Sequence, residues 1–233
     1  LDGLAERLAE YYALGARFTK WRAVVTIGEQ IPTKECLSIN AVMLARFAAL
    51  SQSAGMVPIV EPEVLLHGTH TIARAQEVTG QTLQTLFAAL KAYRVDLGSV
   101  ILKSSMVLAG DGNIAQSSPE EVADATLRMF HLSVPQEVPG AVFLSGGQTP
   151  QRATENLQAI ARQGAQPWRI TFSYSRALEE PVLTAWKGDT NANKGAAQAA
   201  LLHRLMLNAK AQTGDYEAAL EESLSNLNNI SAV

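Results

Sequence analysis

This sequence of 233 residues has a single cysteine, Cys36, which excludes a disulfide framework and a zinc site built from several cysteines. It has no apolar run near the ~20 residues that span a bilayer, and it lacks a cluster of Lys and Arg. With 19 Lys+Arg against 22 Asp+Glu the net charge is −3, so we expect neither nucleic acid nor a membrane as a partner. The acidic first residues are unlike a signal or transit peptide. These absences favour a soluble, cytoplasmic protein.

Motifs for cofactors are also lacking. Neither GxGxxG nor GxxxxGK[ST] occurs, so the sequence does not indicate a nucleotide cofactor. His67 and His70 lie close together but have no third ligand at a convincing spacing, so we expect a loop there and no metal site. No linker or low-complexity tract divides the chain, and a hydrophobic content of 47% can supply a core. We therefore predict one domain over residues 1–233.

Two kinds of segment alternate along the chain. Long stretches with helical periodicity, such as residues 71–94, separate short apolar runs that are typical of strands. The sequence Ser118-Pro119-Glu120-Glu121 predicts a capping box, and Thr149-Pro150 predicts a helix that Gly164 can close. Such alternation predicts a parallel sheet with right-handed crossovers. The expected strands are residues 18–28, 56–62, 99–107, 140–146 and 168–175.

The strand count differs from that of the closed barrel that this pattern suggests. Five strands cannot close an eight-stranded barrel. The chain also begins within an amphipathic helix that has no cap before Leu1, so we expect a further segment before it. Residues 1–213 then supply about five βα units, and residues 214–233 form a helical tail. The expected helices after the last strand are residues 177–188, 191–214 and 215–227.

Charged residues recur in or just after strands that should be apolar. A charge in a dry interior costs several kcal/mol unless it is paired. We therefore expect opposite charges from neighbouring strands to meet in one polar pocket at the carboxyl ends of the strands. The residues concerned are Lys20, Arg22, Glu61, Glu63, Lys103 and Arg176.

Lys103 is the strongest candidate for a catalytic group. Its apolar neighbours in the strand disfavour the ammonium form, and a neutral lysine amine attacks carbonyls to form a Schiff base. Two non-catalytic interpretations of Lys103 remain open on the sequence alone. Lys103 could be a lysine on an edge strand that reaches solvent, or one half of a structural ion pair.

Two strand–helix junctions predict anion sites. Residues 145–149, Ser-Gly-Gly-Gln-Thr, lead from a strand into a capped helix, where backbone N–H groups and the helix dipole favour phosphate. Arg176 follows the next strand, and a guanidinium can hold a phosphate with two hydrogen bonds. A plain tight turn is the alternative for the two glycines.

At these residues the sequence resembles the class I, Schiff-base fructose-bisphosphate aldolases. The resemblance runs in order from Leu1 almost to Tyr216. The matching blocks are LDGLAER (1–7), KWRAVVTIGE (20–29), VPIVEPEVL (57–65), ILKSSMV (101–107), FLSGGQ (143–148), TFSYSRAL (171–178) and AWKG (185–188).

The resemblance implies an eight-stranded (β/α) barrel that cleaves fructose 1,6-bisphosphate reversibly in glycolysis and gluconeogenesis, without metal or cofactor. Lys103 matches the lysine that forms the imine with the ketose C2. Glu61 matches the general acid/base, Glu63 its neighbour that tunes the charge of the site, and Lys20 the lysine that supports the imine region. A cytoplasmic homotetramer is implied as well.

The resemblance also implies two phosphate sites. Arg22 matches an arginine near the C6 phosphate, while Ser145, Gly146 and Arg176 match the C1-phosphate site. The family has glycine where this chain has Ser175, whose backbone N–H can still bind phosphate.

Other departures concern the ends and the lysine strand. The family has about a third more chain before Leu1, which holds an aspartate and a lysine of its active site. It has proline and asparagine where this chain has Ser104 and Ser105, and many members end in a tyrosine, whereas the last tyrosine here is Tyr216. The alternatives are another Schiff-base barrel enzyme, such as a transaldolase or deoxyribose-phosphate aldolase, and a non-catalytic fragment or scaffold.

Overall fold

A five-stranded parallel sheet organises the protein. The structure, a computed structural model, describes residues 1–222. The strands lie in sequence order, each hydrogen-bonded to the next, which confirms the prediction of adjacent parallel strands. Their bounds are β1 Phe18–Val25, β2 Val57–Val64, β3 Ile101–Ser104, β4 Gly140–Phe143 and β5 Arg169–Phe172.

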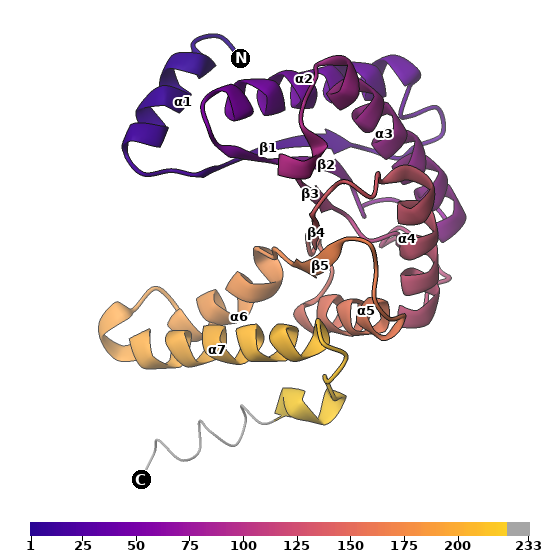
Figure 1. Cartoon of the computed structure of the whole chain (residues 1–233). Coiled ribbons are helices and arrows are strands. Elements are labelled where there is room, and N and C mark those ends of the chain that lie inside the picture. The colour runs from indigo at the N-terminus through magenta and orange to yellow at the C-terminus, as the bar shows by residue number, and fades with distance from the viewer. Residues whose placement is uncertain (223–233) are drawn as a thin grey trace.

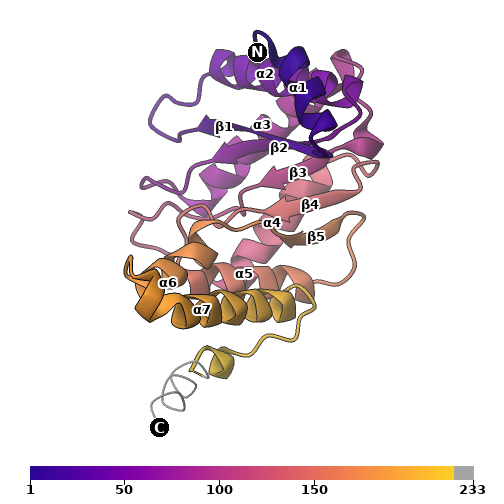
Figure 2. The ribbon, with the colours of Figure 1, turned by 90° about the vertical axis from the view of Figure 1, so that its left-hand side faces the viewer.

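Helices cover one face of this sheet, as Figures 1 and 2 show. The helix after each of the first four strands packs against the helix that follows it in the chain, as right-handed crossovers require. Among residues 1–222 no helical layer covers the opposite face, which lies between α1 (Leu4–Ala13) and the pair of α6 (Arg176–Trp186) and α7 (Thr190–Ala211) (Figure 1). The covering helices are α2 Lys34–Ser53, α3 Ile72–Ala92, α4 Pro119–Ser133 and α5 Pro150–Arg162.

The fold is therefore the α/β architecture that the sequence predicts, with five βα units of a barrel that residues 1–222 do not close. Within these residues no helix is both long enough and apolar enough to cross a membrane. The core lies between the sheet and its covering helices. The expected core stripe of α3 is buried there, with Leu83, Leu86 and Leu90 at 0% exposure and Phe87 at 4%.

Caps fix the helix starts, and with them the loops that reach the carboxyl ends of the strands. Ser118 forms the expected capping box with Glu121, and Thr149 accepts a hydrogen bond from the N–H of Arg152 at the start of α5. Thr33 and Thr71 cap α2 and α3 in the same way. Because each cap satisfies an N–H that the helix leaves free, the strand–helix loops end at defined residues.

Several predicted bounds were wrong. Four strands, β1, β3, β4 and β5, end earlier than the apolar runs do, and β2 ends two residues later. After β4 and β5 the N–H groups of Leu144 and Ser173 still donate to the carbonyls of Ser104 and Phe143 as isolated bonds. Helix α1, Leu4–Ala13, does not begin before Leu1; its N-cap is Gly3, in the left-handed conformation (φ 62°).

The tail also differs from the expectation. Helices α6, Arg176–Trp186, and α7, Thr190–Ala211, are present as predicted. Of the third predicted helix, residues 215–227, the first three residues are not helical, Ala218–Glu222 form a short 3₁₀ helix, η2, and the last five lie outside the described part.

Buried polar contacts hold the last described segment against α5 and α7. Arg204 of α7 is 4% exposed and donates to Glu221 Oε2 at 2.5 Å. It also donates to the carbonyl of Pro150 at 2.8 Å and to Thr154 Oγ1 at 2.6 Å, which joins the tail to the first turn of α5. Since removal of one partner would leave a buried charge, these contacts fix α7 beside the loop that precedes α5.

His203, next to Arg204, gives a prediction about acid stability. Its ring is buried and its Nε2 has no hydrogen-bond partner. Burial, and to a smaller extent the positive charge of Arg204, lower the pKa of His203, while Glu221 opposes the shift. Because the pKa is lower in the folded state, the stability contributed by the neutral ring is complete above its unfolded pKa and is lost as pH falls through the folded value.

We therefore expect the free energy of unfolding to fall more steeply between pH 7 and pH 5 in the wild type than in His203→Gln, measured by urea unfolding. His131→Gln, a change at an exposed histidine of α4, is the control and should keep the wild-type slope. Equal slopes for His203→Gln and the wild type would contradict this account.

Candidate active site

The predicted charged residues line one groove, which extends from β1 and β2 past Lys103 of β3 to the segments after β4 and β5. The groove has a volume of about 260 Å³. Four cationic and two anionic side chains leave a formal excess of two positive charges, which suits an anionic ligand. Its lining residues are Lys20, Arg22, Glu61, Glu63, Lys103, Leu144, Ser145, Gly146, Ser173, Ser175 and Arg176.

Glu61 lies between two lysines from neighbouring strands. Its Oε1 is 3.3 Å from Lys103 Nζ on β3, and its Oε2 is 3.2 Å from Lys20 Nζ on β1. The carboxylate is almost fully buried, the Lys103 side chain is 11% exposed, and Lys20 is half exposed. One negative charge thus offsets the cost of holding two ammonium groups at the bottom of the groove.

Glu61 keeps one acceptor position open. Lys20 Nζ lies 3.2 Å from Oε2 as an ion-pair partner, but among residues 1–222 no donor is aligned for a hydrogen bond to this buried oxygen. A carboxylate oxygen has more than one lone pair, so the ion pair leaves Oε2 able to accept from another group. Glu61 Oε2 can therefore accept a proton or a hydrogen bond from a group that enters the groove.

The position of Lys103 decides between its alternative interpretations. β3 is the central strand of the sheet, so the interpretation as an edge-strand lysine was wrong. The ion-pair interpretation agrees with the contact to Glu61. In the structure the Glu61 carboxylate contacts the ammonium groups of both Lys103 and Lys20. This ion pair does not exclude a catalytic role for Lys103, because a carboxylate beside a protonated amine can accept its proton.

Arg22 and Glu63 form a second ion pair. One residue separates Lys20 from Arg22 and Glu61 from Glu63, so both pairs lie on the same face of paired strands. Arg22 Nε donates to Glu63 Oε2, and this hydrogen bond raises the pKa of Arg22. Glu63 is 3% exposed, whereas the Arg22 side chain is half exposed, so a ligand in the groove can reach it.

The loop between β4 and α5 has the geometry of an anion site. Gly146 and Gly147 both have positive φ, 59° and 96°, which favours glycine. A Cβ on Gly147 would lie 3.6 Å from Arg176 Nη2, so the guanidinium stacks close to the loop backbone. Ser145 is 3% exposed, and α5 begins at Pro150 directly behind the loop. The structure thus brings together Ser145, Gly146 and Arg176 as expected.

Ser175 shows that this junction does not need glycine. It is the N-cap of α6 and has φ −101°, outside the left-handed region. A serine is therefore accommodated at the position where the family has glycine. Its side chain forms no cap hydrogen bond, and both Ser175 and Arg176 are exposed at the groove.

Ser173 is a groove residue that sequence reasoning missed. Its N–H donates to the carbonyl of Phe143 at 2.8 Å, which extends the β4–β5 contact beyond the strand ends. Ser173 and Ser175 are two positions apart and both line the groove, while Tyr174 between them is buried. That spacing was the signal that could have identified Ser173.

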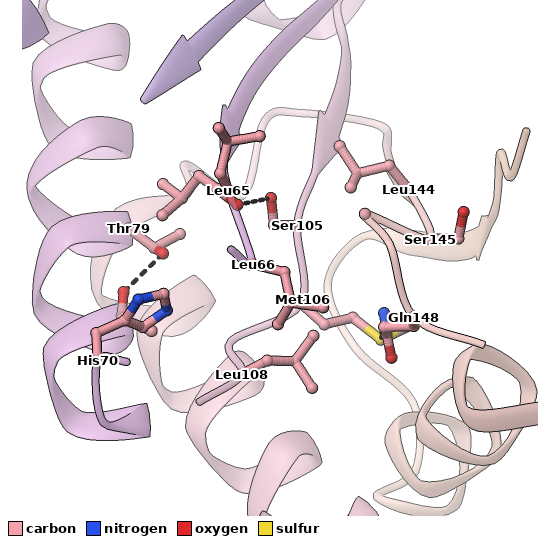
Figure 3. Close-up of a pocket in the computed structure, with 13 residues that line it drawn as sticks. Leu65, Leu66, His70, Thr79, Ser105, Met106, Leu108, Leu144, Ser145 and Gln148 are labelled. Carbon is pink, nitrogen blue, oxygen red and sulfur yellow. Dashed lines mark hydrogen bonds between the residues drawn. The ribbon is translucent and has the colours of Figure 1, made fainter. Parts of the chain in front are cut away.

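A second, smaller cavity of about 20 Å³ adjoins the groove and shares Ser145 with it (Figure 3). His70 lines this cavity; its Nδ1 has no hydrogen-bond partner, and burial lowers the pKa of its ring. His67 Nδ1 lies 3.2 Å from Asp111 Oδ2, and the two residues belong to different loops. Neither histidine belongs to a set of three or more His, Cys, Asp or Glu residues that could hold a metal, among residues 1–222.

The anion-site loop gives a prediction on stability and binding. In Gly146→Ala the new Cβ would approach Leu144 Cδ1 to 2.9 Å, in addition to the strain of positive φ. Gly164→Ala also has positive φ (88°) but open space around the Cβ, so it is the control.

Both variants should lose about 1–2 kcal/mol of unfolding free energy from the left-handed backbone. Gly146→Ala should lose ~0.5–1.5 kcal/mol more, because Leu144 must leave its rotamer. Urea unfolding measures this difference, and calorimetry should find weaker binding of inorganic phosphate for Gly146→Ala alone. Equal losses in both variants would show that the Leu144 contact is unimportant.

Comparisons with known proteins agree on one family. A family model described as glycolytic, fructose-bisphosphate aldolase class-I, matches residues 1–232. The probable fructose-bisphosphate aldolase class 1 of Xanthomonas campestris is 48% identical over 217 residues, which are 93% of this chain and 65% of that protein. The cytosolic fructose-bisphosphate aldolase 4 of Arabidopsis thaliana is 44% identical over 228 residues, which are 97% of this chain and 58% of that protein.

A solved structure agrees with these relatives. Fructose-bisphosphate aldolase from Plasmodium falciparum, in a ternary complex with TRAP and a small-molecule inhibitor, superposes with a TM-score of 0.91 at 42% identity. The match covers 93% of this chain and 63% of that one. The chain therefore spans less than two thirds of the length of these proteins.

Proposed function

This chain belongs to the class I fructose-bisphosphate aldolase family, and we propose that its groove catalyses the reversible cleavage of fructose 1,6-bisphosphate to dihydroxyacetone phosphate and glyceraldehyde 3-phosphate. One observation carries the proposal: a lysine amine and a buried carboxylate, Lys103 and Glu61, lie 3.3 Å apart between two cationic ends of one groove. This arrangement suits a nucleophile that must lose a proton, bond to a carbonyl and then expel water.

Glu61 first acts as a base and then as an acid. It accepts a proton from the ammonium of Lys103, and the neutral amine attacks C2 of the ketose to form a carbinolamine. Glu61 then returns the proton to the C2 hydroxyl, which leaves as water and gives an iminium. Glu61 Oε2 contacts Lys20 as an ion pair, but no donor among residues 1–222 is aligned for a hydrogen bond to it, so it can accept from the group that undergoes this proton transfer.

The iminium is an electron sink for the carbon–carbon bond. Loss of a proton from the C4 hydroxyl and cleavage of C3–C4 release glyceraldehyde 3-phosphate, and the electron pair moves into an enamine on Lys103. Protonation at C3 and addition of water then release dihydroxyacetone phosphate. Lys20 and Glu63 are assigned to the charge balance of the imine region. Lys20 acts by its ion pair with Glu61. Glu63 acts by its ion pair with Arg22.

The two phosphates are assigned to opposite ends of the groove. Arg176 lies beside the Gly146–Gly147 backbone and forms, with Ser145 and Ser175, the C1-phosphate site. Arg22 of β1, two strands from Lys103, is assigned to the C6 phosphate. Fixing both ends aligns C2 with the amine, which lowers the entropic part of the barrier.

We also propose that the enzyme is cytoplasmic and acts as a homo-oligomer, a tetramer by family resemblance. The names of relatives support the location: one is the cytosolic aldolase of Arabidopsis thaliana, and another is a cytoplasmic isozyme of Pisum sativum.

A non-catalytic scaffold is the second candidate. One observation favours it: β1 and β5 each have a free edge in the part of the chain that the structure describes, and free strand edges readily pair with other strands. Chemistry at Lys103 distinguishes the two candidates.

Borohydride should trap a covalent adduct on Lys103 in the presence of dihydroxyacetone phosphate, since the iminium is reducible. Peptide mass spectrometry locates the adduct. Lys103→Arg should abolish it, and Lys91→Arg, a change in the last turn of α3, should leave it intact. An adduct on Lys20 with Lys103 unmodified would reverse the assignment, and no adduct at all would favour the scaffold.

Arg176→Ala should remove a charge-assisted contact worth ~1.5–3 kcal/mol, or about 10- to 150-fold in affinity, for substrates phosphorylated at C1. Arg22→Ala should be most harmful when the C6 phosphate is present. Steady-state kinetics with fructose 1,6-bisphosphate and fructose 1-phosphate compare the two variants. If both weakened both substrates equally, the two arginines would not serve opposite ends of the ketose.

A further inference from the structure

The ladder between β2 and β3 stops just before the reacting groups. Its register pairs are Ile59 with Ile101 and Val60 with Leu102, one residue short of Glu61 and Lys103. On its other side β3 stays paired with β4 through Ser104, and the hydrogen bond from Leu144 N–H to the Ser104 carbonyl continues the contact. The strand that carries Lys103 is thus well fixed toward β4 and less so toward β2, where Glu61 lies.

A buried serine bridges this gap. Ser105 Oγ donates to the carbonyl of Val64, the last residue of β2, at 2.9 Å (Figure 3). Ser105 and Val64 are both 6% exposed, so water does not compete for the bond. The bond joins the two strands beyond Glu61 and Glu63 on β2 and beyond Lys103 on β3.

We propose that Ser105 is a positioning residue, whose hydrogen bond to Val64 holds the ends of β2 and β3 together and so keeps the Lys103 amine within proton-transfer distance of Glu61. This inference rests on the proposed function for its catalytic consequence. Ser105 does not line the charged groove; it lines the small cavity beside it, so it acts through the strands and not on the substrate.

Ser104 is a matched control next to it. It has the same side chain, is 0% exposed and belongs to the same strand end. Its hydroxyl, however, donates to the carbonyl of Ser105 at 3.1 Å, a local contact that joins no second strand. Removing either hydroxyl deletes one buried hydrogen bond, but Ser105→Ala alone breaks the tie between β2 and β3.

The test compares the wild type with Ser105→Ala, Ser104→Ala and Ser105→Thr. The rate of borohydride trapping on Lys103 at saturating dihydroxyacetone phosphate measures imine formation, and calorimetry measures the affinity for inorganic phosphate. A misplaced reacting group costs on the order of 10–100-fold in rate. We expect Ser105→Ala to slow trapping about 10-fold or more, with phosphate affinity within about twofold, because Ser105 does not line the groove that holds the proposed phosphate sites.

Ser105→Thr keeps the hydroxyl, and its extra methyl can enter the neighbouring cavity of about 20 Å³, so it should restore the rate. Ser104→Ala should slow trapping less than about threefold. Equal slowing by Ser104→Ala and Ser105→Ala, or no restoration by Ser105→Thr, would overturn the positioning role.

Amide hydrogen exchange separates this inference from the proposed function. Ser105→Ala should raise exchange in residues 61–66 and 103–107, whereas Ser104→Ala should leave residues 61–66 unchanged. If the wild type forms no adduct on Lys103, the proposed function fails, and the exchange difference alone supports or overturns the tie between β2 and β3.

Discussion

One buried carboxylate sets the chemistry of this protein. Glu61 contacts Lys103 through one oxygen and Lys20 through the other, and three neighbouring strands supply the three side chains. Without the carboxylate, two ammonium groups would share a poorly hydrated groove, which costs several kcal/mol. The same carboxylate is the nearest proton acceptor for Lys103. The interaction that makes the charges tolerable is therefore also the one that can move a proton.

The surrounding fold holds the strands at a fixed separation. Capped helices cover one face of the sheet and bury the apolar half of each strand, which leaves the polar half free to converge. On β1 the inward residues Ala23 and Val25 are buried, while Lys20 and Arg22 face the groove. A one-residue slip of β1 would exchange these faces, so the same alternation secures both core and site.

Alternation also explains how much could be predicted from the sequence. The charges of KWR and VEPE repeat every second residue, and extended chains place such residues on one face, so the groove could be foreseen from the residues alone. The strand ends could not, because the ladders stop at Leu102 and Phe143 for reasons of sheet geometry and not of composition. Ser105 was noted only as a departure from the family pattern, since a hydrogen bond across 41 residues leaves no local signal.

Glu61 and Glu63, both on β2, pair with different kinds of cation. They share a face and are equally buried, yet Glu61 contacts lysines and Glu63 contacts arginine. A guanidinium stays charged at any pH that enzymes experience, so the pair of Glu63 and Arg22 is fixed in charge. A lysine can lose its proton, so the pair of Glu61 and Lys103 can change charge. In the proposed function, proton transfer therefore falls to Glu61, while Glu63 holds Arg22 through their ion pair.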